Sequence, residues 1–260
     1  MASLALRFKP RNAIWWNMLT DDEIDRYARH LVLKEIGGLG QIRLKAAKVA
    51  LIGMGGIGSP AALYLAAAGV GTLGLIDDDI ISLSNLQRQV LFATRDIGAS
   101  KVEVAATHLK ALNPHVDCRP HSLRLSEANA AATLCDYDIV LDGCDNFETR
   151  MLVNRVCHDL GKPLVSAALG RFSGQLATFE KSPCYRCLVP EIPPDAETCE
   201  RVGVVGALAG ILGSMAALEV IKVITGNGET LKNQLLIFDG LTWQSRLVRL
   251  PADPNCPVCS

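Results

Sequence analysis

A glycine-rich loop between a predicted strand and a predicted helix is the feature that most constrains the fold of this chain. Gly53, Gly55 and Gly58 have the spacing Gly-x-Gly-x-x-Gly, with the apolar run 48–52 before them and the alanine-rich segment 60–69 after them. In this context the glycines allow a tight turn, and backbone N–H groups at the start of the helix can face a phosphate. The loop therefore predicts the first βαβ unit of a dinucleotide-binding fold.

The alternation of predicted elements extends this unit into a larger sheet. Strands are expected at 71–77, 116–121, 138–142 and 163–168, and helices at 101–112, 126–135 and 149–160. From residue 170 the alternation of strands and helices ends. Apolar and polar residues alternate over 174–180, as in an antiparallel strand, and a hairpin is expected over 234–239 and 242–250. We predict an α/β fold with a Rossmann-like, doubly wound, mostly parallel sheet and an antiparallel C-terminal extension.

Length and composition set the domain organisation. The chain has 260 residues, 49% of them hydrophobic, which suits one large domain or two small ones. We expect a flexible tail over 1–19 and a single nucleotide-binding domain over 20–260, which opens with a helix from Thr20 to about Gly37. The first 17 residues are basic and lack acids, but no apolar segment with a cleavage site follows them.

Charge and hydropathy exclude two classes of partner. A net charge of −1 gives no nucleic-acid footprint. The segment 202–218 is free of charge but falls just short of a membrane span, and Glu219 and Lys222 follow at once. We predict that it is a buried core helix, and that the protein is cytoplasmic with neither a membrane nor a nucleic-acid partner.

Two Cys-x-x-Cys pairs lie far apart in the C-terminal part of the chain. Cys184 and Cys187 form the first pair, and Cys256 and Cys259 form the second. Free or disulfide-linked thiols are the alternative, but two distant pairs are typical of a structural zinc site with four thiolate ligands. We therefore predict zinc at these cysteines.

Charged residues around the glycine loop bear on which nucleotide binds. Asp77 ends the second strand, where a carboxylate can accept hydrogen bonds from ribose hydroxyls of either NAD or ATP. Arg88 and Lys101 then supply two cations, and Asp145 follows a central strand. Two cations and a carboxylate suit a triphosphate with Mg²⁺, whereas a nicotinamide pyrophosphate needs neither. The alternative is an NAD-dependent oxidoreductase that uses the same loop.

Several motifs occur in the order found in one family: Arg26-Tyr27-x-Arg29-His30, the glycine loop, Ser84-Asn85-Leu86-Gln87-Arg88-Gln89, Lys101, Asp145-Asn146 and the two cysteine pairs. Over about residues 20–259 the chain resembles the MoeB/ThiF/HesA group, prokaryotic relatives of ubiquitin-activating enzymes. The resemblance implies an adenylyltransferase that uses ATP and Mg²⁺ to activate the C-terminal Gly-Gly carboxylate of a small ubiquitin-fold sulfur carrier protein. It also implies a homodimer.

The resemblance also implies roles for individual residues. Asp145 would hold Mg²⁺, and Arg29 would reach the γ-phosphate bound by the partner subunit. The residues expected to contact the nucleotide and its phosphates are Gly53, Gly55, Gly56, Gly58, Asp77, Ser84, Asn85, Leu86, Gln87, Arg88, Lys101, Asp145 and Asn146.

Cys199 lies in a predicted surface loop and is a candidate catalytic residue. In ThiF-like relatives a cysteine at this place links covalently to the carrier, while in MoeB-like ones a similar cysteine is dispensable. Glu197 and Glu200 disfavour a reactive thiolate here, and Arg201 opposes them. The carrier of molybdenum cofactor biosynthesis and that of thiamine biosynthesis both stay open, with a slight preference for the former. No rhodanese domain follows Cys259, so we expect a separate sulfur donor.

Overall fold

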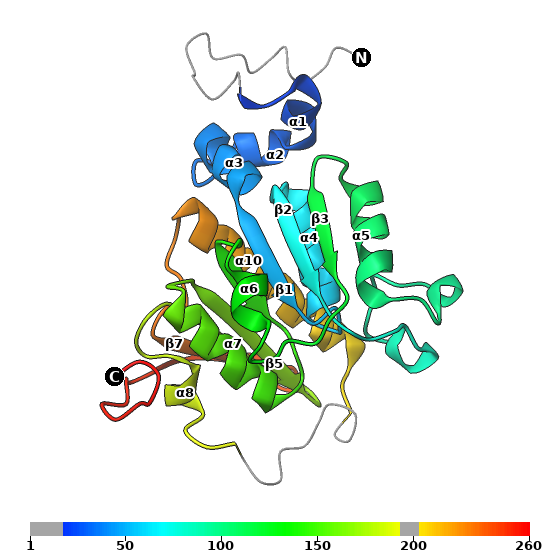
Figure 1. The fold of residues 1–260 in the computed structure, drawn as a ribbon. Coiled ribbons are helices and arrows are strands. Elements are labelled where there is room, and N and C mark those ends of the chain that lie inside the picture. The colour runs from blue at the N-terminus through cyan, green and yellow to red at the C-terminus, as the bar shows by residue number, and fades with distance from the viewer. Residues whose placement is uncertain (1–17, 193–202) are drawn as a thin grey trace.

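The computed structural model describes residues 18–192 and 203–260. Most of the predicted N-terminal tail, and Cys199 with its neighbours, lie outside the described residues. All the strands of the described part join one sheet of eight, in the order β3-β2-β1-β4-β5-β6-β7-β8 (Figure 1). The strands are β1 (Lys48–Ile52), β2 (Thr72–Ile76), β3 (Asp117–His121), β4 (Ile139–Asp142), β5 (Leu164–Gly170), β6 (Ser173–Phe179), β7 (Gln234–Asp239) and β8 (Gln244–Arg249).

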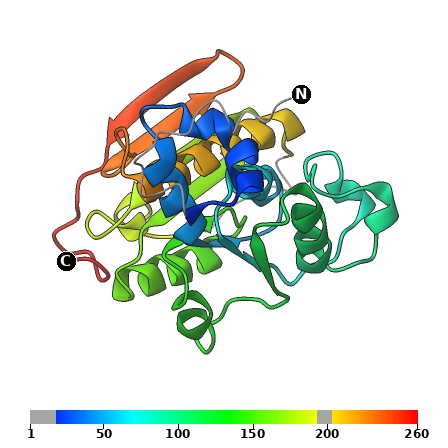
Figure 2. The ribbon, with the colours of Figure 1, turned by 90° about the horizontal axis from the view of Figure 1, so that it is seen from above.

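The strand directions confirm the predicted fold class. β1 to β5 pair in parallel, and β5 to β8 pair antiparallel. The order reverses between β1 and β4, which makes their carboxyl ends the switch point where doubly wound sheets bind ligands. Figure 2 shows the β7–β8 hairpin at one margin of the sheet, away from α5 (Lys101–Leu112).

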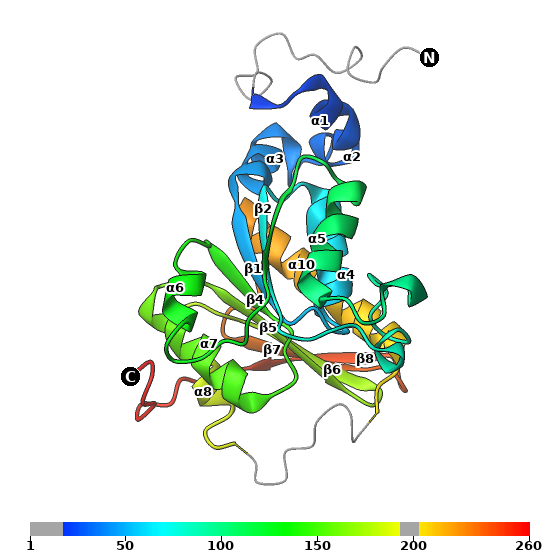
Figure 3. The same cartoon turned by 45° about the vertical axis from the view of Figure 1, so that its right-hand side comes forward.

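Helices cover both faces of the parallel strands, as Figure 3 shows. One face carries α3 (Gly37–Ala46), α4 (Gly58–Ala68), α5 (Lys101–Leu112) and α10 (Gly206–Thr225), and the other carries α6 (Ala130–Leu134), α7 (Phe147–Asp159) and α8 (Tyr185–Leu188). Two separate apolar clusters fill these layers. Leu65 and Leu212 are central to the first cluster, and Leu134 and Val153 to the second.

The N-terminal segment differs from the single helix predicted over 20–37. It forms α1 (Asp21–Arg26) and α2 (Ala28–Leu31), and α3 begins at Gly37, where a helix end was expected. Thr20 caps α1 in a reciprocal capping box with Glu23, as the sequence suggested. The helix is interrupted at Tyr27, which lies between α1 and α2. The buried Tyr27 hydroxyl accepts a hydrogen bond from Asn113 Nδ2 at 2.8 Å. Tertiary packing of this side chain overrides the continuous helical pattern.

The long apolar helix α10 is a core helix, as predicted, although it lies at 206–225 rather than 202–218. By length and composition alone it could cross a membrane. Its buried side chains, Leu208, Leu212, Ala216 and Val220, belong to the first apolar cluster. Gly213 allows the close approach of α4, since a Cβ there would lie 2.4 Å from Pro60 Cγ. The opposite side of α10 leaves Leu218 58% exposed.

Short 3₁₀ helices, η3 (Leu83–Asn85) and η4 (Thr94–Asp96), interrupt the long connection between β2 and α5. This connection carries the polar stretch that follows Asp77 in the sequence. It passes beside the glycine loop, because the nearest side-chain atom to a Cβ built on Gly55 is Gln89 Nε2 at 3.9 Å. The fold thus brings the charged residues of this connection to the carboxyl end of the sheet.

Candidate active site

A cavity of about 830 Å³ lies at the carboxyl ends of the parallel strands. Its lining includes most of the nucleotide-binding residues expected from the sequence: Gly53, Gly55, Gly56, Asp77, Asn85, Arg88, Lys101, Asp145 and Asn146. A second part of the lining is mainly apolar and includes Ala168, Leu169, Tyr185, Leu188, Val189 and Leu235. One continuous space is therefore lined both by the charged residues near the glycine loop and by apolar residues of β5 and α8.

The glycine loop needs its glycines for two separate reasons. Gly53 has φ +84°, a left-handed conformation that favours glycine, and its N–H donates to the Ile76 carbonyl at 2.8 Å. At Gly58 the reason is close approach, since a Cβ there would lie 1.9 Å from the Gly53 carbonyl oxygen. Among the described residues that line the cavity, Gly58 is not included, so its role is to allow the tight turn of the loop.

Asp77 is held in a fixed orientation at the end of β2. One carboxylate oxygen accepts from Met54 N–H at 2.7 Å, and the other accepts from Asp79 N–H at 2.9 Å. Burial raises the pKa of the Asp77 carboxyl, while Lys101 and the two N–H groups act in the opposite direction. Lys101 Nζ lies 4.0 Å from Asp77 and donates to Asp79 at 2.7 Å.

The polar stretch after β2 contributes only some of its residues to the cavity. Asn85 lines it, and its side-chain oxygen accepts from Ser82 N–H at 3.2 Å. Arg88 also lines it, and its guanidinium folds back to donate to the Ser84 carbonyl at 3.0 Å. The cavity lining in the described part of the chain does not include three residues expected to contact nucleotide: Ser84, Leu86 and Gln87.

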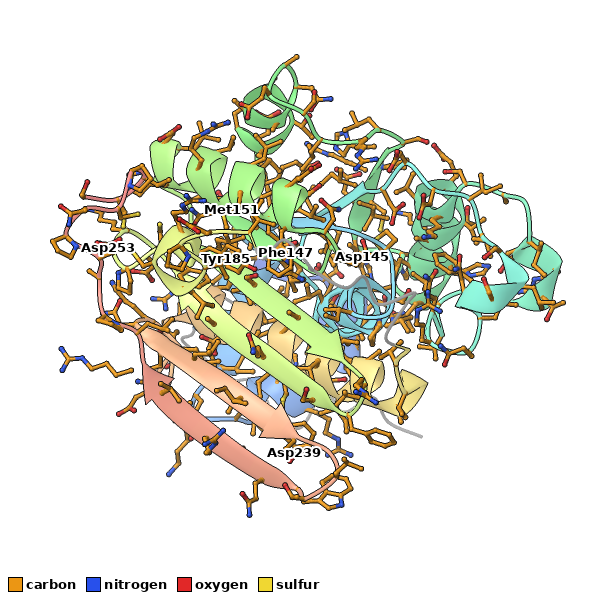
Figure 4. All side chains as sticks on the ribbon, turned by 90° about the horizontal axis from the view of Figure 1, so that it is seen from below. Asp145, Phe147, Met151, Tyr185, Asp239 and Asp253 are labelled. Carbon is orange, nitrogen blue, oxygen red and sulfur yellow. The ribbon has the colours of Figure 1, made fainter. Side chains whose placement is uncertain are left out.

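Asp145 and Asn146 lie between β4 and α7, at the mouth of the cavity. The Asp145 side chain is exposed, so it is open to a ligand. Asn146 caps α7, because its side-chain oxygen accepts from Thr149 N–H at 2.8 Å. Figure 4 shows Asp145 and Phe147 in this region, and Tyr185 lines the same cavity from α8.

Arg29 does not lie with the other candidate residues. It is exposed on α2, which belongs to the group of helices that precedes β1, at the amino ends of the strands (Figure 1). The cavity is at the carboxyl ends, and its lining in the described residues does not include Arg29.

Two residues that sequence reasoning did not single out belong to this site. Gln89 is 3% exposed, lines the cavity, and its side-chain oxygen has no hydrogen-bond partner in the described part of the chain. Arg150 is buried and hydrogen-bonds to the Cys144 carbonyl, one residue before Asp145. The signal for Arg150 was available, since a charged residue at a core-facing position of an amphipathic helix is rarely buried without a partner. Gln89 is adjacent to Arg88 in the same motif.

The four paired cysteines come together as predicted, away from the nucleotide end. Their Sγ atoms lie within 4.8 Å of one another, with 3.7 Å between Cys184 and Cys256 and 3.5 Å between Cys187 and Cys259. A zinc tetrahedron with bonds of about 2.3 Å has S–S edges of about 3.8 Å, so these thiols fit zinc. Burial opposes the Cys256 thiolate, but the N–H groups of Val258 and Cys259, together with the thiols of Cys259 and Cys184, outweigh burial and lower the pKa of this thiol to about 7.

The fold and the two sites together define a nucleotide-binding enzyme with a four-cysteine metal centre. Residues 27–258 match the ThiF family. The chain belongs to the ThiF family and is an adenylyltransferase. This membership decides between the two enzyme classes that the sequence left open, against the oxidoreductase.

Individual relatives agree with this assignment. The chain is 45% identical over 249 residues to a sulfur carrier protein adenylyltransferase of Thermus thermophilus, covering 92% of each chain. It is 48% identical over 247 residues to the adenylyltransferase and sulfurtransferase MOCS3 of Drosophila persimilis, covering 93% of this chain but about half (55%) of that relative. Among solved structures, E. coli MccB with ATP matches with a TM-score of 0.79 at 26% identity, covering 90% of this chain and 74% of that one.

Proposed function

We propose that this adenylyltransferase activates the C-terminal Gly-Gly carboxylate of a ubiquitin-fold sulfur carrier protein. The observation that carries the proposal is the continuity of the cavity. The charged residues of its lining suit a triphosphate, and the apolar lining near Ala168 and Tyr185 suits an extended peptide segment without charged side chains that ends in the reacting carboxylate. The name of the Thermus relative, a sulfur carrier protein adenylyltransferase, supports the same substrate class.

In the proposed reaction the tail carboxylate attacks the α-phosphorus of ATP. An oxygen–phosphorus bond forms, the bond to the β-phosphate oxygen breaks, and the products are an acyl-adenylate and pyrophosphate. The carboxylate is already ionised, so no general base is needed, and catalysis consists of positioning and charge neutralisation. Gly56 and Asp77 would hold the nucleoside side of ATP, while Asn85, Arg88 and Lys101 would bind its phosphates.

Asp145 is the residue that would hold Mg²⁺. Its carboxylate is exposed at the cavity, and oxygen ligands are those that Mg²⁺ prefers. Two of the other acids at the cavity are less available, because Asp77 accepts two backbone N–H groups and Asp79 accepts from Lys101, whereas Asp78 is also exposed there. The bound ion would neutralise part of the charge that develops on the phosphates.

A homodimer in which Arg29 reaches the partner's nucleotide completes the proposal. Arg29 is exposed and remote from the cavity of its own subunit, so only a second subunit could bring it there. A shallow apolar groove across α4 and α10, lined by Tyr64, Val90, Ile211 and Met215, gives two subunits a surface to bury. Apolar surface of this kind commonly marks a protein interface.

The remaining assignments concern the pathway. We treat residues 20–260 as one adenylation domain in the cytoplasm, which uses a separate sulfur donor and serves molybdenum cofactor or thiamine biosynthesis. The free thiols of the described cysteines fit a reducing compartment. Cys199 lies outside the described residues and is retained as the candidate thiol for a covalent link to the carrier. Loss of a carrier–enzyme adduct in Cys199→Ser, with adenylation intact, would support that link.

Mass spectrometry of the carrier proteins tests the main proposal. Each candidate carrier is incubated with the enzyme, ATP and Mg²⁺, and the expected product is the carrier plus one AMP group, with release of pyrophosphate. A carrier lacking its last glycine is the matched control and should gain no AMP. If no Gly-Gly carrier gains AMP although the enzyme binds ATP, the proposal is wrong.

A further inference from the structure

Helix α7 connects the nucleotide cavity to the four-cysteine site. It begins directly after Asp145 and Asn146, and it carries Arg150 and Asn154 one turn apart on its buried face. Both polar side chains are almost completely buried, with exposed fractions of 5% and 2%. Their hydrogen bonds reach different segments, those of Arg150 to β4 and β5 and those of Asn154 to Cys184 and Tyr185.

Arg150 braces the loop that carries Asp145. Its Nη1 donates to an Asp142 carboxylate oxygen at 3.1 Å and to Ser166 Oγ at 2.9 Å. Its Nη2 donates to the carbonyl of Ala167 at 2.8 Å and also to the carbonyl of Cys144. The Cys144 N–H in turn donates to Asp142 at 3.0 Å. The peptide before Asp145 is therefore held on both sides by buried groups.

Asn154 contacts the cysteine loop directly. Its side-chain oxygen accepts from Tyr185 N–H at 2.8 Å, and its Nδ2 donates to Cys184 Sγ at 3.5 Å. An N–H donor to a ligating sulfur is the kind of contact that orients metal ligands and tunes metal affinity. The Tyr185 ring lies 6.0 Å from the Arg150 guanidinium, so this residue contacts both members of the pair.

Burying the hydrogen-bonded side chains of Arg150 and Asn154 costs free energy that packing alone does not justify. A buried Arg–Asp pair rarely stabilises a fold more than apolar side chains of the same volume would, although it can fix one conformation. The hydrogen bonds described above join segments that lead to the two sites: residues 142–146 and β5 at the cavity, and Cys184 with Tyr185 at the four-cysteine site. The arrangement therefore has the geometry of a connection between the sites.

We propose that Arg150 and Asn154 are positioning residues that couple metal occupancy of the four-cysteine site to nucleotide binding at Asp145, an inference that rests on the proposed function. Cys184, once it ligates a metal, would hold Tyr185 and Asn154 in place, and one turn of α7 would pass this order to Arg150 and to the carbonyl before Asp145. Coupling between two binding sites is reciprocal, so bound nucleotide tightens metal binding by the same factor.

Zinc competition with a chelator measures this factor on the intact protein without any carrier. Zinc affinity is determined with and without a non-hydrolysable ATP analogue and Mg²⁺, and the ratio of the two values is the coupling. For the wild type we expect the analogue to raise zinc affinity about 5-fold or more, the lower end of typical couplings. In Asn154→Leu, which has similar volume and neither hydrogen bond, the ratio should approach one.

Val153→Ala is the matched control. It lies on the same helix in the second apolar cluster, and its truncation should lower the melting temperature while leaving the ratio at its wild-type value. A purely structural role for Asn154 would give the same pattern as this control. Arg150→Lys provides a second variant, which keeps the charge but loses the forked contacts to two carbonyls.

The outcomes separate the two proposals. A wild-type ratio of one with normal binding of the analogue overturns the coupling and leaves the adenylation proposal intact. A ratio that survives in both Asn154→Leu and Arg150→Lys also overturns it. Failure of the wild type to bind the ATP analogue at all overturns both.

Discussion

The Lys101 ammonium lies 2.7 Å from an Asp79 carboxylate oxygen, inside the cavity that we assign to ATP. Lys101 is buried, whereas the Asp79 side chain is mostly exposed, so the pair is open to solvent on one side only. A phosphate entering the cavity would compete with Asp79 for the same ammonium. The lysine is thus oriented by a carboxylate that a substrate can replace.

Removal of Lys101 should abolish most of the activity. We expect Lys101→Ala to lower carrier-dependent ATP–pyrophosphate exchange by about 100-fold or more, the usual loss when one donor to transition-state charge is deleted. Lys110→Ala, at the exposed end of the same helix, is the control and should retain full exchange. Equal exchange in the two variants would contradict a phosphate-binding role for Lys101.

Asp79→Asn tests the competition itself. It removes the negative charge beside Lys101 but keeps a side chain of the same size. We expect the KM for ATP to fall about 2- to 5-fold, which corresponds to the roughly 0.4–1 kcal/mol of a solvent-exposed ion pair. Steady-state exchange at varied ATP measures it, and an increased KM would show that Asp79 helps to hold the nucleotide.

Gln89 should show opposite effects on binding and on stability. Its buried side-chain oxygen lacks a protein partner in the described part of the chain, so a donor on the nucleotide could supply a hydrogen bond of about 1–1.5 kcal/mol there. Gln89→Leu should therefore weaken ATP binding about 10-fold, by calorimetry, while the melting temperature stays the same or rises. A lower melting temperature with unchanged ATP affinity would instead assign Gln89 to the core.

The sequence predicts the local elements and motifs of this fold better than the contacts between them. The glycine loop between β1 and α4 and the four-cysteine cluster could be predicted because each has a spacing tied to local geometry. Ser84 and Leu86 were expected at the nucleotide because they share a motif with Arg88, yet the cavity lining in the described residues includes only Asn85, Arg88 and Gln89 of that motif. Which residues of a motif face a cavity depends on tertiary packing, which the order of residues does not encode.

Arg29 and Arg150 illustrate the same limit over longer distances. The distance of Arg29 from its own cavity follows from the position of α2 at the amino ends of the strands. The brace made by Arg150 requires β4, β5 and α8 to meet around α7, and these segments are up to 43 residues apart, between Asp142 and Tyr185. No local pattern specifies that meeting.

Complementation between subunits tests the action of Arg29 in trans. Arg29→Ala and Lys101→Ala should each be nearly inactive alone. In a mixed dimer, one cavity would have both an intact Lys101 and an intact Arg29 from the other subunit, so about half of the active sites of each heterodimer should recover. ATP–pyrophosphate exchange after co-refolding or co-expression of the two variants measures this. The absence of recovery in dimers shown to be mixed would contradict the proposal.

The capping box that begins α1 predicts a pH-dependent contribution to stability. Burial raises the pKa of Glu23, but the Lys45 ammonium and the Thr20 N–H lower it more, so the net pKa lies below its ordinary 4.5. The stability that this carboxylate contributes is therefore present above pH 4.5 and is lost as the pH falls through the lower, folded-state pKa. Glu23→Gln should lower the free energy of unfolding by about 1–2 kcal/mol at pH 7, and by progressively less as the pH falls below 4.5.

Thermal melts of Glu23→Gln and the wild type across pH 3–7 measure this difference. Glu103→Gln is the control, since Glu103 is an exposed residue in the first turn of α5. A difference between Glu23→Gln and the wild type that stays constant over this range would mean that the Glu23 charge adds nothing to the cap.

The four-cysteine site predicts one zinc ion per chain in freshly purified, reduced protein. Cys259→Ser removes one of four ligands from a closed tetrahedral site, so bound zinc should fall below about half of the wild-type content after dialysis against a weak chelator. The melting temperature should fall with it, because a metal bound only to the folded state stabilises that state by mass action. Cys135→Ser changes an exposed thiol outside the cluster and should keep both zinc and melting temperature. Elemental analysis decides the question, since a wild-type protein without zinc, or a Cys259→Ser variant with full zinc, would mean that these thiols serve another purpose.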